Sequence, residues 1–217
     1  MSNDPTLKRG PDFLKPLAVH PTAGALTALD RASPTSKKLS FHMERQKQSN
    51  WCWAAVSMSV SRLFDQKSVW QQCSVADRAL SRSDCCDAAA NDPCNIPWHL
   101  DRALNVTGNF VRMTDNSETF QTASGEIDNG RPLCCRIGWR LGSAHFVAIY
   151  GWLLGTSGTE YFFVSDPIYG LTRIVRSSFA SKYQGGGTWT HSYFVGPNSG
   201  GGAIAFSTAP DPATIGA

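Results

Sequence analysis

The stretch "QSNWCWAAVSMSVSRLF", residues 48–64, places a cysteine between two tryptophans where a polar segment changes into an apolar run. The spacing of the apolar residues predicts a helix with one buried face, on which Trp53, Val56, Val60 and Phe64 lie. Cys52 therefore lies where this helix should begin. Taken alone, it has three interpretations: a buried core thiol, half of a disulfide, or a nucleophile at a helix N-terminus.

The segments downstream of this helix predict the fold class. Further helices are expected at residues 68–82 with Ser68 as N-cap, 98–106, and 117–131 with Ser117 as N-cap and Asn129-Gly130 as terminator. After Gly130 the pattern changes to strands, at residues 132–139, 144–154, 160–167, 171–178 and 188–195, with a helical turn at 178–184. Helices followed by a run of strands predict an α+β fold, with an N-terminal helical half and a C-terminal antiparallel sheet.

The chain of 217 residues has the size of one domain. Residues 1–40 are expected to be a basic, flexible leader or a pro-segment, 41–196 the folded domain, and 197–217 a tail rich in Gly, Pro and Ala. Residues 1–50 hold eight Lys/Arg and four Asp/Glu, so residues 51–217 sum to −1 of the total +3. A nearly neutral domain does not indicate nucleic-acid binding, and no apolar run is long enough to predict a membrane helix.

The distribution of His and Asp supplies partners that a nucleophilic cysteine needs. Such a thiol requires a base, a group that orients the base, and donors for the oxyanion. His145 follows a small-residue turn and opens an apolar strand, and Asp166 closes the next strand. Because antiparallel neighbours place the start of one strand beside the end of the other, Asp166 is expected to orient His145 toward Cys52.

Two glutamines precede the cysteine and are candidates for the oxyanion donor. Gln46 lies six residues before Cys52, and its side-chain amide can donate beside the Cys52 backbone N–H, although Gln48 is nearer. Trp53 is expected to pack in the core, whereas Trp51 is left between covering the edge of the cleft and contacting substrate.

Three motifs together resemble a known family. "QKQSNWCWAA", "GRPLCCRIGW…GSAHFVAIYGW" and "VSDPIYG" are similar to the papain-like cysteine proteases of bacteria, most of all the effector proteases of plant pathogens and more distantly the bacteriocin leader peptidases. The resemblance covers roughly residues 41–195 and implies a papain-like fold, with the nucleophile helix packed on the sheet. It also implies Cys52 as nucleophile, His145 as general base and acid, Asp166 as orienting residue and Gln46 as oxyanion donor. One departure is Ala144, where the effector type has Gly.

The resemblance also implies a biological setting. It predicts an endopeptidase that cleaves proteins or peptides without a metal or organic cofactor, acting as a secreted effector or interbacterial toxin. Residues 1–19 lack the apolar core of a standard signal peptide, so export to a host or rival cell would use a dedicated route. An immunity or inhibitor protein is an expected partner. Two other functions remain open: deamidation or transglutamination by the same residues, and a non-catalytic cysteine-stapled binding domain.

The remaining cysteines allow several interpretations. The chain has seven, an odd number, so at least one thiol stays unpaired in a monomer. Disulfides that join Cys73 to Cys85 or Cys86, and the remaining one of these to Cys94, are favoured over reduced thiols or a zinc site that includes His99. Cys134 and Cys135 are adjacent on a strand and should face opposite sides of the sheet.

Overall fold

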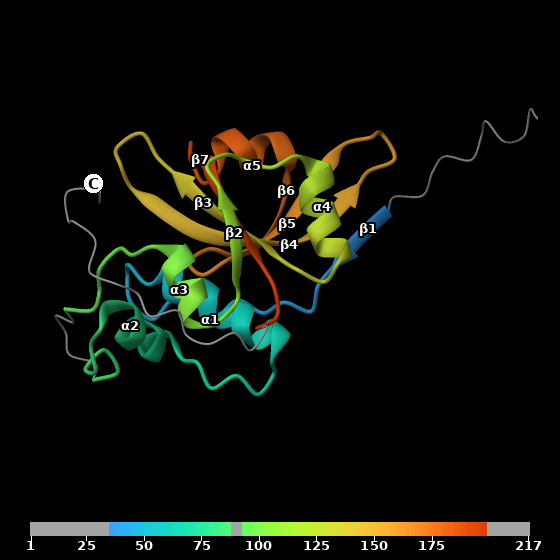
Figure 1. The fold of residues 1–217 in the computed structure, drawn as a ribbon. Coiled ribbons are helices and arrows are strands. Elements are labelled where there is room, and N and C mark those ends of the chain that lie inside the picture. The colour runs from blue at the N-terminus through green and yellow to red at the C-terminus, as the bar shows by residue number, and fades with distance from the viewer. Residues whose placement is uncertain (1–34, 88–92, 199–217) are drawn as a thin grey trace, which may run out of the picture. The chain divides into compact units, whose positions relative to one another are not determined.

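The computed structural model describes residues 35–87 and 93–198, and an antiparallel sheet organises them. The seven-stranded sheet has the order β2-β7-β3-β4-β5-β6, and β1 pairs with the far end of β4. Helices cover both of its faces (Figure 1), with α1, α2 and α3 on one side and α4 and α5 on the other. The predicted α+β class is therefore confirmed, although the sequence did not predict helices on two faces.

The elements follow the chain in this order: β1 Thr35–Lys38, α1 Cys52–Phe64, α2 Gln72–Leu80, α3 Leu100–Val106, β2 Phe110–Thr114, α4 Phe120–Asp128, β3 Leu133–Gly138, β4 Ala144–Leu154, β5 Glu160–Asp166, β6 Gly170–Val175, α5 Arg176–Lys182 and β7 Thr188–Val195.

Three helices begin later than the sequence predicts: α3 begins at Leu100 after His99, and in α2 and α4 the N-caps differ from the predicted ones. The N-cap of α2 is Gln71, whose side chain accepts from the backbone of Ser74 while the Ser74 hydroxyl accepts from the Gln71 N–H, so Ser68 lies outside the helix. The N-cap of α4 is Thr119, which accepts from the Thr122 N–H at 3.0 Å and replaces the predicted cap two residues upstream. The predicted end of α4 is confirmed, since Asn129 is its C-cap and Gly130 has a φ of +79°.

Strands β1 and β2 are not predicted from the sequence. All four residues of β1 are exposed, as are the middle three of β2, so neither strand has the alternating apolar residues that mark a half-buried strand. The pairing of Thr35 with Leu154 and Lys38 with Gly151 makes β1 part of the sheet. The domain thus includes residues that the sequence analysis assigns to the leader. The rest of that leader, 1–34, and residues 199–217 of the tail lie outside the described residues.

The sheet separates two hydrophobic cores, and β3 contributes to both. Cys134 packs with α1 in the core beneath the first three helices, whereas Cys135 packs with Phe179 of α5 in the opposite core. The two adjacent cysteines therefore face opposite sides of the sheet, as predicted.

Helix α1 is the centre of the helical half. Every residue from Cys52 to Ser61 is buried, and the helix contacts α2, α3 and β4. These residues of the helix are thus buried on all sides, whereas the sequence predicts burial of one face only. Small residues such as Ala54, Ala55 and Ser57 let neighbouring elements approach closely on the other sides, and the Ser57 hydroxyl donates to the Trp53 carbonyl within the helix.

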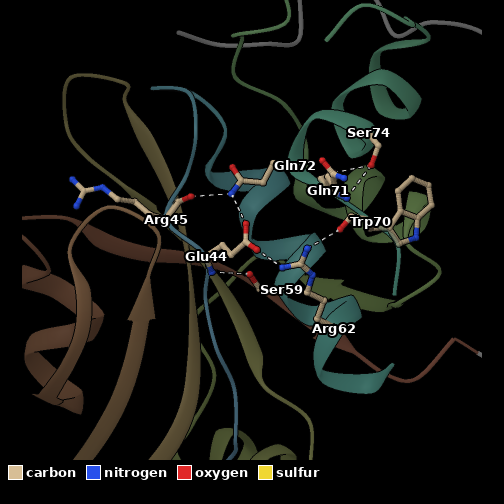
Figure 2. A network of polar contacts seen from close by, with 8 residues as sticks. All are labelled: Glu44, Arg45, Ser59, Arg62, Trp70, Gln71, Gln72 and Ser74. Carbon is tan, nitrogen blue, oxygen red and sulfur yellow. Dashed lines mark hydrogen bonds and ion pairs between the residues drawn. The ribbon is translucent and has the colours of Figure 1, made fainter. Parts of the chain in front are cut away.

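A buried glutamine of α2 holds the segment that precedes α1. Gln72 is fully buried, and its amide donates to the Arg45 carbonyl at 2.8 Å and accepts from the Lys47 N–H at 2.8 Å. Figure 2 shows this amide beside Glu44, which forms an ion pair with Arg62 of α1. Because these contacts bracket Gln46, they set the path of the chain into α1.

Among the described helices, none is long and apolar enough to cross a membrane.

Candidate active site

Cys52 lies at the floor of an open cleft. It is the first residue of α1, is 7% exposed, and lines a cleft of about 1220 Å³ between the helical half and the sheet. Backbone N–H groups in the first turn of a helix have no acceptor within the helix. The Cys52 N–H is therefore a donor that can serve an anion at this place.

His145 and Asp166 meet where the sequence analysis expects them. His145 is near the start of β4, Asp166 is the last residue of β5, and the two strands are antiparallel neighbours. The His145 Nε2 and Asp166 Oδ1 atoms are 2.9 Å apart, with both side chains buried. Since the carboxylate takes the proton on Nε2, the Nδ1 atom is left for Cys52, whose side chain also influences the pKa of the ring.

The Asp166 carboxylate accepts four hydrogen bonds. Besides His145, its Oδ1 accepts from the backbone N–H groups of Ile168 and Tyr169 at 2.7 and 3.0 Å, and its Oδ2 accepts from the Tyr183 hydroxyl at 2.7 Å. Burial alone would raise the pKa of Asp166, but the His145 hydrogen bond and these donors hold it below its usual value. Asp166 is therefore ionised and fixed in place.

The imidazole is held in its protonated form. Burial alone would lower the pKa of His145, but the hydrogen bonds and charges of Asp166 and Cys52 outweigh burial and raise it to about 9. A protonated imidazole next to Cys52 can give its proton to a departing group. The arrangement can therefore supply both a nucleophile and a proton donor.

The other two unpaired cysteines have a different environment. Cys134 and Cys135 are fully buried, and burial raises the pKa of each thiol. They therefore remain protonated and inert, whereas Cys52 faces the cleft.

Gln46 lies beside the site, but its amide is engaged elsewhere. Its backbone N–H donates to the Pro167 carbonyl at 3.0 Å, next to Asp166. Its Nε2 donates to the carbonyls of Gln48 and Ser49 at 2.9 and 2.6 Å, and its buried Oε1 has no partner. In this conformation Gln46 orders the loop before Cys52, and its role as oxyanion donor stays a prediction.

The structure corrects the expected substrate contact of Trp51. This side chain is 2% exposed and packs in the core, and its Nε1 donates to the Cys94 carbonyl at 2.8 Å. Trp53, which is also buried in the core, contributes to the cleft lining in its place. The indole of Trp51 needs a buried acceptor, and Cys94 supplies it, so the ring turns inward.

Residues 94–96, here called the 94–96 segment, form hydrogen bonds with residues before and after Cys52 in the chain. Asn95 accepts from the Asn50 N–H through Oδ1 and from the Asn50 side chain through its backbone carbonyl, each at 2.9 Å. The Ile96 carbonyl accepts from Trp53 Nε1 at 3.1 Å. Together with the bond from Trp51, these contacts fix the residues on either side of Cys52.

Disulfides anchor this segment to α2. Cys85 is bonded to Cys94, and Cys73 of α2 is bonded to Cys86, a pairing that the sequence left open between two alternatives. These four cysteines are thus not the thiolates that the alternative zinc site would need.

Sequence reasoning missed Tyr183 and Asn95. Tyr183 follows α5 and reaches Asp166 from the opposite core, so no local pattern marks it. Asn95 sits in a loop next to Cys94, and only its place between Cys94 and Pro97 marks a constrained turn.

The helical half with a cysteine at its first helix, and the antiparallel sheet that carries His and Asp, define a papain-like cysteine hydrolase. Residues 35–184 match the family described as papain-like cysteine protease AvrRpt2. The chain belongs to this family, whose members are hydrolases that act on proteins. A search among curated proteins gave no match.

Proposed function

We propose that the protein is a cysteine endopeptidase in which Cys52 attacks, His145 transfers the proton and Asp166 orients the imidazole. One observation carries this proposal: Cys52 and His145 line the same cleft, Cys52 acts electrostatically on the His145 ring, and this ring is hydrogen-bonded to the buried Asp166 carboxylate. His145 and Asp166 also have the environments that their roles require, because their partners raise the pKa of His145 and lower that of Asp166.

The reaction is acyl transfer. The thiolate sulfur adds to the peptide carbonyl carbon, and the backbone N–H of Cys52 donates to the resulting oxyanion. The His145 imidazolium gives its proton to the leaving amine as the C–N bond breaks, which leaves a thioester on Cys52. Neutral His145 then takes a proton from water, the hydroxide adds to the thioester, and the acid is released with the thiol restored.

We further propose that the protein acts outside the cell that makes it, as an effector or toxin delivered to a host or rival cell. The two disulfides support this setting, because such bonds persist in oxidising compartments. A protease released against proteins that the producer shares would need an inhibitory immunity partner. The cleft around Cys52 is the surface that such an inhibitor would cover.

The test is N-terminal labelling of the proteome of a susceptible cell extract after treatment with the wild type or with Cys52→Ala. New N-termini that depend on Cys52 are expected, and they would reveal activity, target and cleavage motif together. Cys134→Ala is the matched control, since it removes a thiol that is buried away from the cleft.

Two results would count against proteolysis. If intact targets gained about 1 Da per site instead of new termini, the same residues would be catalysing deamidation. If neither change occurred, and a peptide-like alkylating probe labelled Cys52 no faster than the other thiols, the domain would be a binding module.

A further inference from the structure

The cleft contains a cation that the proposed catalytic residues do not use. Arg136 of β3 lies opposite Phe146 of β4 and opposite His191 of β7, so the three side chains form a row across neighbouring strands. All three line the same cleft as Cys52. Phe146 directly follows His145 in the chain, and His145 lines this cleft as well.

Two local features of the sheet orient the Arg136 side chain. The register of β3 and β7 shifts between Arg136 and Ile137, which makes Thr190 an extra residue between Trp189 and His191. The Arg136 Nη1 donates to the Thr190 hydroxyl at 3.1 Å. A Cβ at Gly138 would lie 3.3 Å from Nη1, so the glycine leaves room for the guanidinium.

Arg136 has no carboxylate partner among residues 35–87 and 93–198. None of the ion pairs in these ranges includes it, and the nearby Asp115 faces His191 instead, with 3.5 Å between the His191 Nε2 and Asp115 Oδ1 atoms. Of the described residues that line the cleft, Asp101 is the only acid. A half-buried guanidinium loses part of its hydration, and a partner anion would compensate for this loss.

The neighbours of Arg136 complete a site for a short acidic side chain. The Phe146 and Tyr193 rings, 5.8 Å apart, offer an apolar surface for its methylene groups. Burial and the charge of Arg136 lower the pKa of His191, so this imidazole is neutral near pH 7. Arg136 is then the charged group of the row.

We infer that Arg136 is a specificity-determining residue, which binds an aspartate or glutamate side chain of the substrate next to the scissile bond. The inference rests on the proposed protease function and adds a substrate class to it: peptides with an acidic residue close to the cleaved bond. The guanidinium forms charge-assisted hydrogen bonds with the carboxylate while Thr190 holds its far edge.

The experiment compares peptides that differ only by Glu or Gln. A scaffold peptide that the wild type cleaves is synthesised with Glu, and separately with Gln, at each position around the cleaved bond, and kcat/KM is measured for every pair. We expect a preference of about tenfold or more for Glu at one position. In Arg136→Gln this preference should fall to about one, and in Arg136→Lys it should return in part.

Controls separate Arg136 from general effects. Arg173→Gln removes a charge from β6, where the guanidinium lies over the Tyr161 ring, and should leave the Glu preference intact. Arg140 also lines the cleft, so a preference that vanished in Arg140→Gln and persisted in Arg136→Gln would overturn the inference. An unchanged melting temperature of Arg136→Gln shows that the variant is folded.

Failure of the inference and failure of the proposed function give different results. A peptidyl alkylating probe is first used to label Cys52. If Cys52 reacts and the peptides are cleaved with equal efficiency for Glu and Gln, only the inference fails. If Cys52 does not react and no peptide is cleaved, both fail.

Discussion

The two halves that meet at the cleft hold their reactive groups by different means. Side-chain to backbone hydrogen bonds with the 94–96 segment fix the residues beside Cys52, and a disulfide ties this segment to Cys85 in the loop after α2. His145 lies on β4, a strand paired on both sides. Its partner Asp166 accepts hydrogen bonds from four donors, of which His145 is one. The oxidation state of the Cys85–Cys94 pair should therefore govern the position of Cys52. The protonation states of His145 and Asp166 should govern the position of the base.

The largest effect is expected from removing the base. His145→Ala should lower kcat/KM by about 10³-fold or more, because it removes the group that is proposed to take the thiol proton and to return it to the leaving amine. The measurement is steady-state cleavage of a fluorogenic peptide. His42→Ala, which removes an exposed histidine, should stay within about twofold of the wild type. A loss below tenfold in His145→Ala would remove this residue from the mechanism.

The next effect concerns Gln46, at the junction of the two halves. Gln46→Ala is expected to lower kcat by about 10²-fold with little change in KM, if its amide turns from the loop carbonyls to the oxyanion during the reaction. Gln48→Ala is the matched control, since it removes the competing amide. Equal losses in the two variants would mean that Gln46 only orders the loop.

A smaller effect is expected when the anchor of the 94–96 segment is cut. Replacing both Cys85 and Cys94 by Ala should lower the free energy of unfolding by about 2–3 kcal/mol. It should also lower kcat/KM about tenfold, because misplacing the nucleophile slightly is costly to the rate. The measurements are denaturant unfolding and peptide cleavage.

The other disulfide provides the control for this comparison. Replacing Cys73 and Cys86 by Ala removes a loop closure of similar length, 13 residues apart against 9, and should destabilise the fold about equally. Its effect on kcat/KM should be smaller, because the hydrogen bonds described above for Asn50, Trp51 and Trp53 go to residues 94–96 and not to Cys86. Equal losses of activity would show that both bonds act only through general stability.

The smallest effect is the dependence of stability on pH. His145 has a folded pKa of about 9 against 6.5 unfolded, so its contribution is complete below about pH 6.5 and is lost as the pH rises through about 9. Asp166 has a pKa below 3.8 when folded, so its contribution is present above about pH 3.8 and is lost as the pH falls through the folded value. The melting temperature should therefore fall at both ends of a pH series, and His145→Gln should reduce the alkaline fall.

The parts of the fold that the sequence predicts are those with regular apolar spacing. Helix α1 and strands β3, β4, β5 and β7 are buried elements, and their positions follow from helical spacing or from apolar runs between turns. The positions of His145 and Asp166 then follow from antiparallel pairing. Strands β1 and β2 have mostly polar, exposed residues, so only their backbone partners identify them.

The parts of the site that the sequence does not predict depend on contacts between distant segments. Tyr183 reaches Asp166 through the core on the far face of the sheet, and Trp51 turns inward because Cys94 provides an acceptor. The sequence could not decide the disulfide pairing either, because Cys85 and Cys86 are adjacent. Only the directions of their side chains in the folded protein distinguish the two possible pairings.

The reactivity of the two neighbouring thiols of β3 can be used to measure local opening of the two cores. Cys134 faces the core beneath α1, and Cys135 faces the core beneath α5, so each becomes reactive only when its own core opens. In the native protein a thiol reagent should modify Cys52 first, and the order in which the other two follow reveals which side of the sheet opens at lower free energy. Mass spectrometry of partially alkylated protein would then measure the free energy of opening for each of the two cores separately, within one molecule and without any substitution.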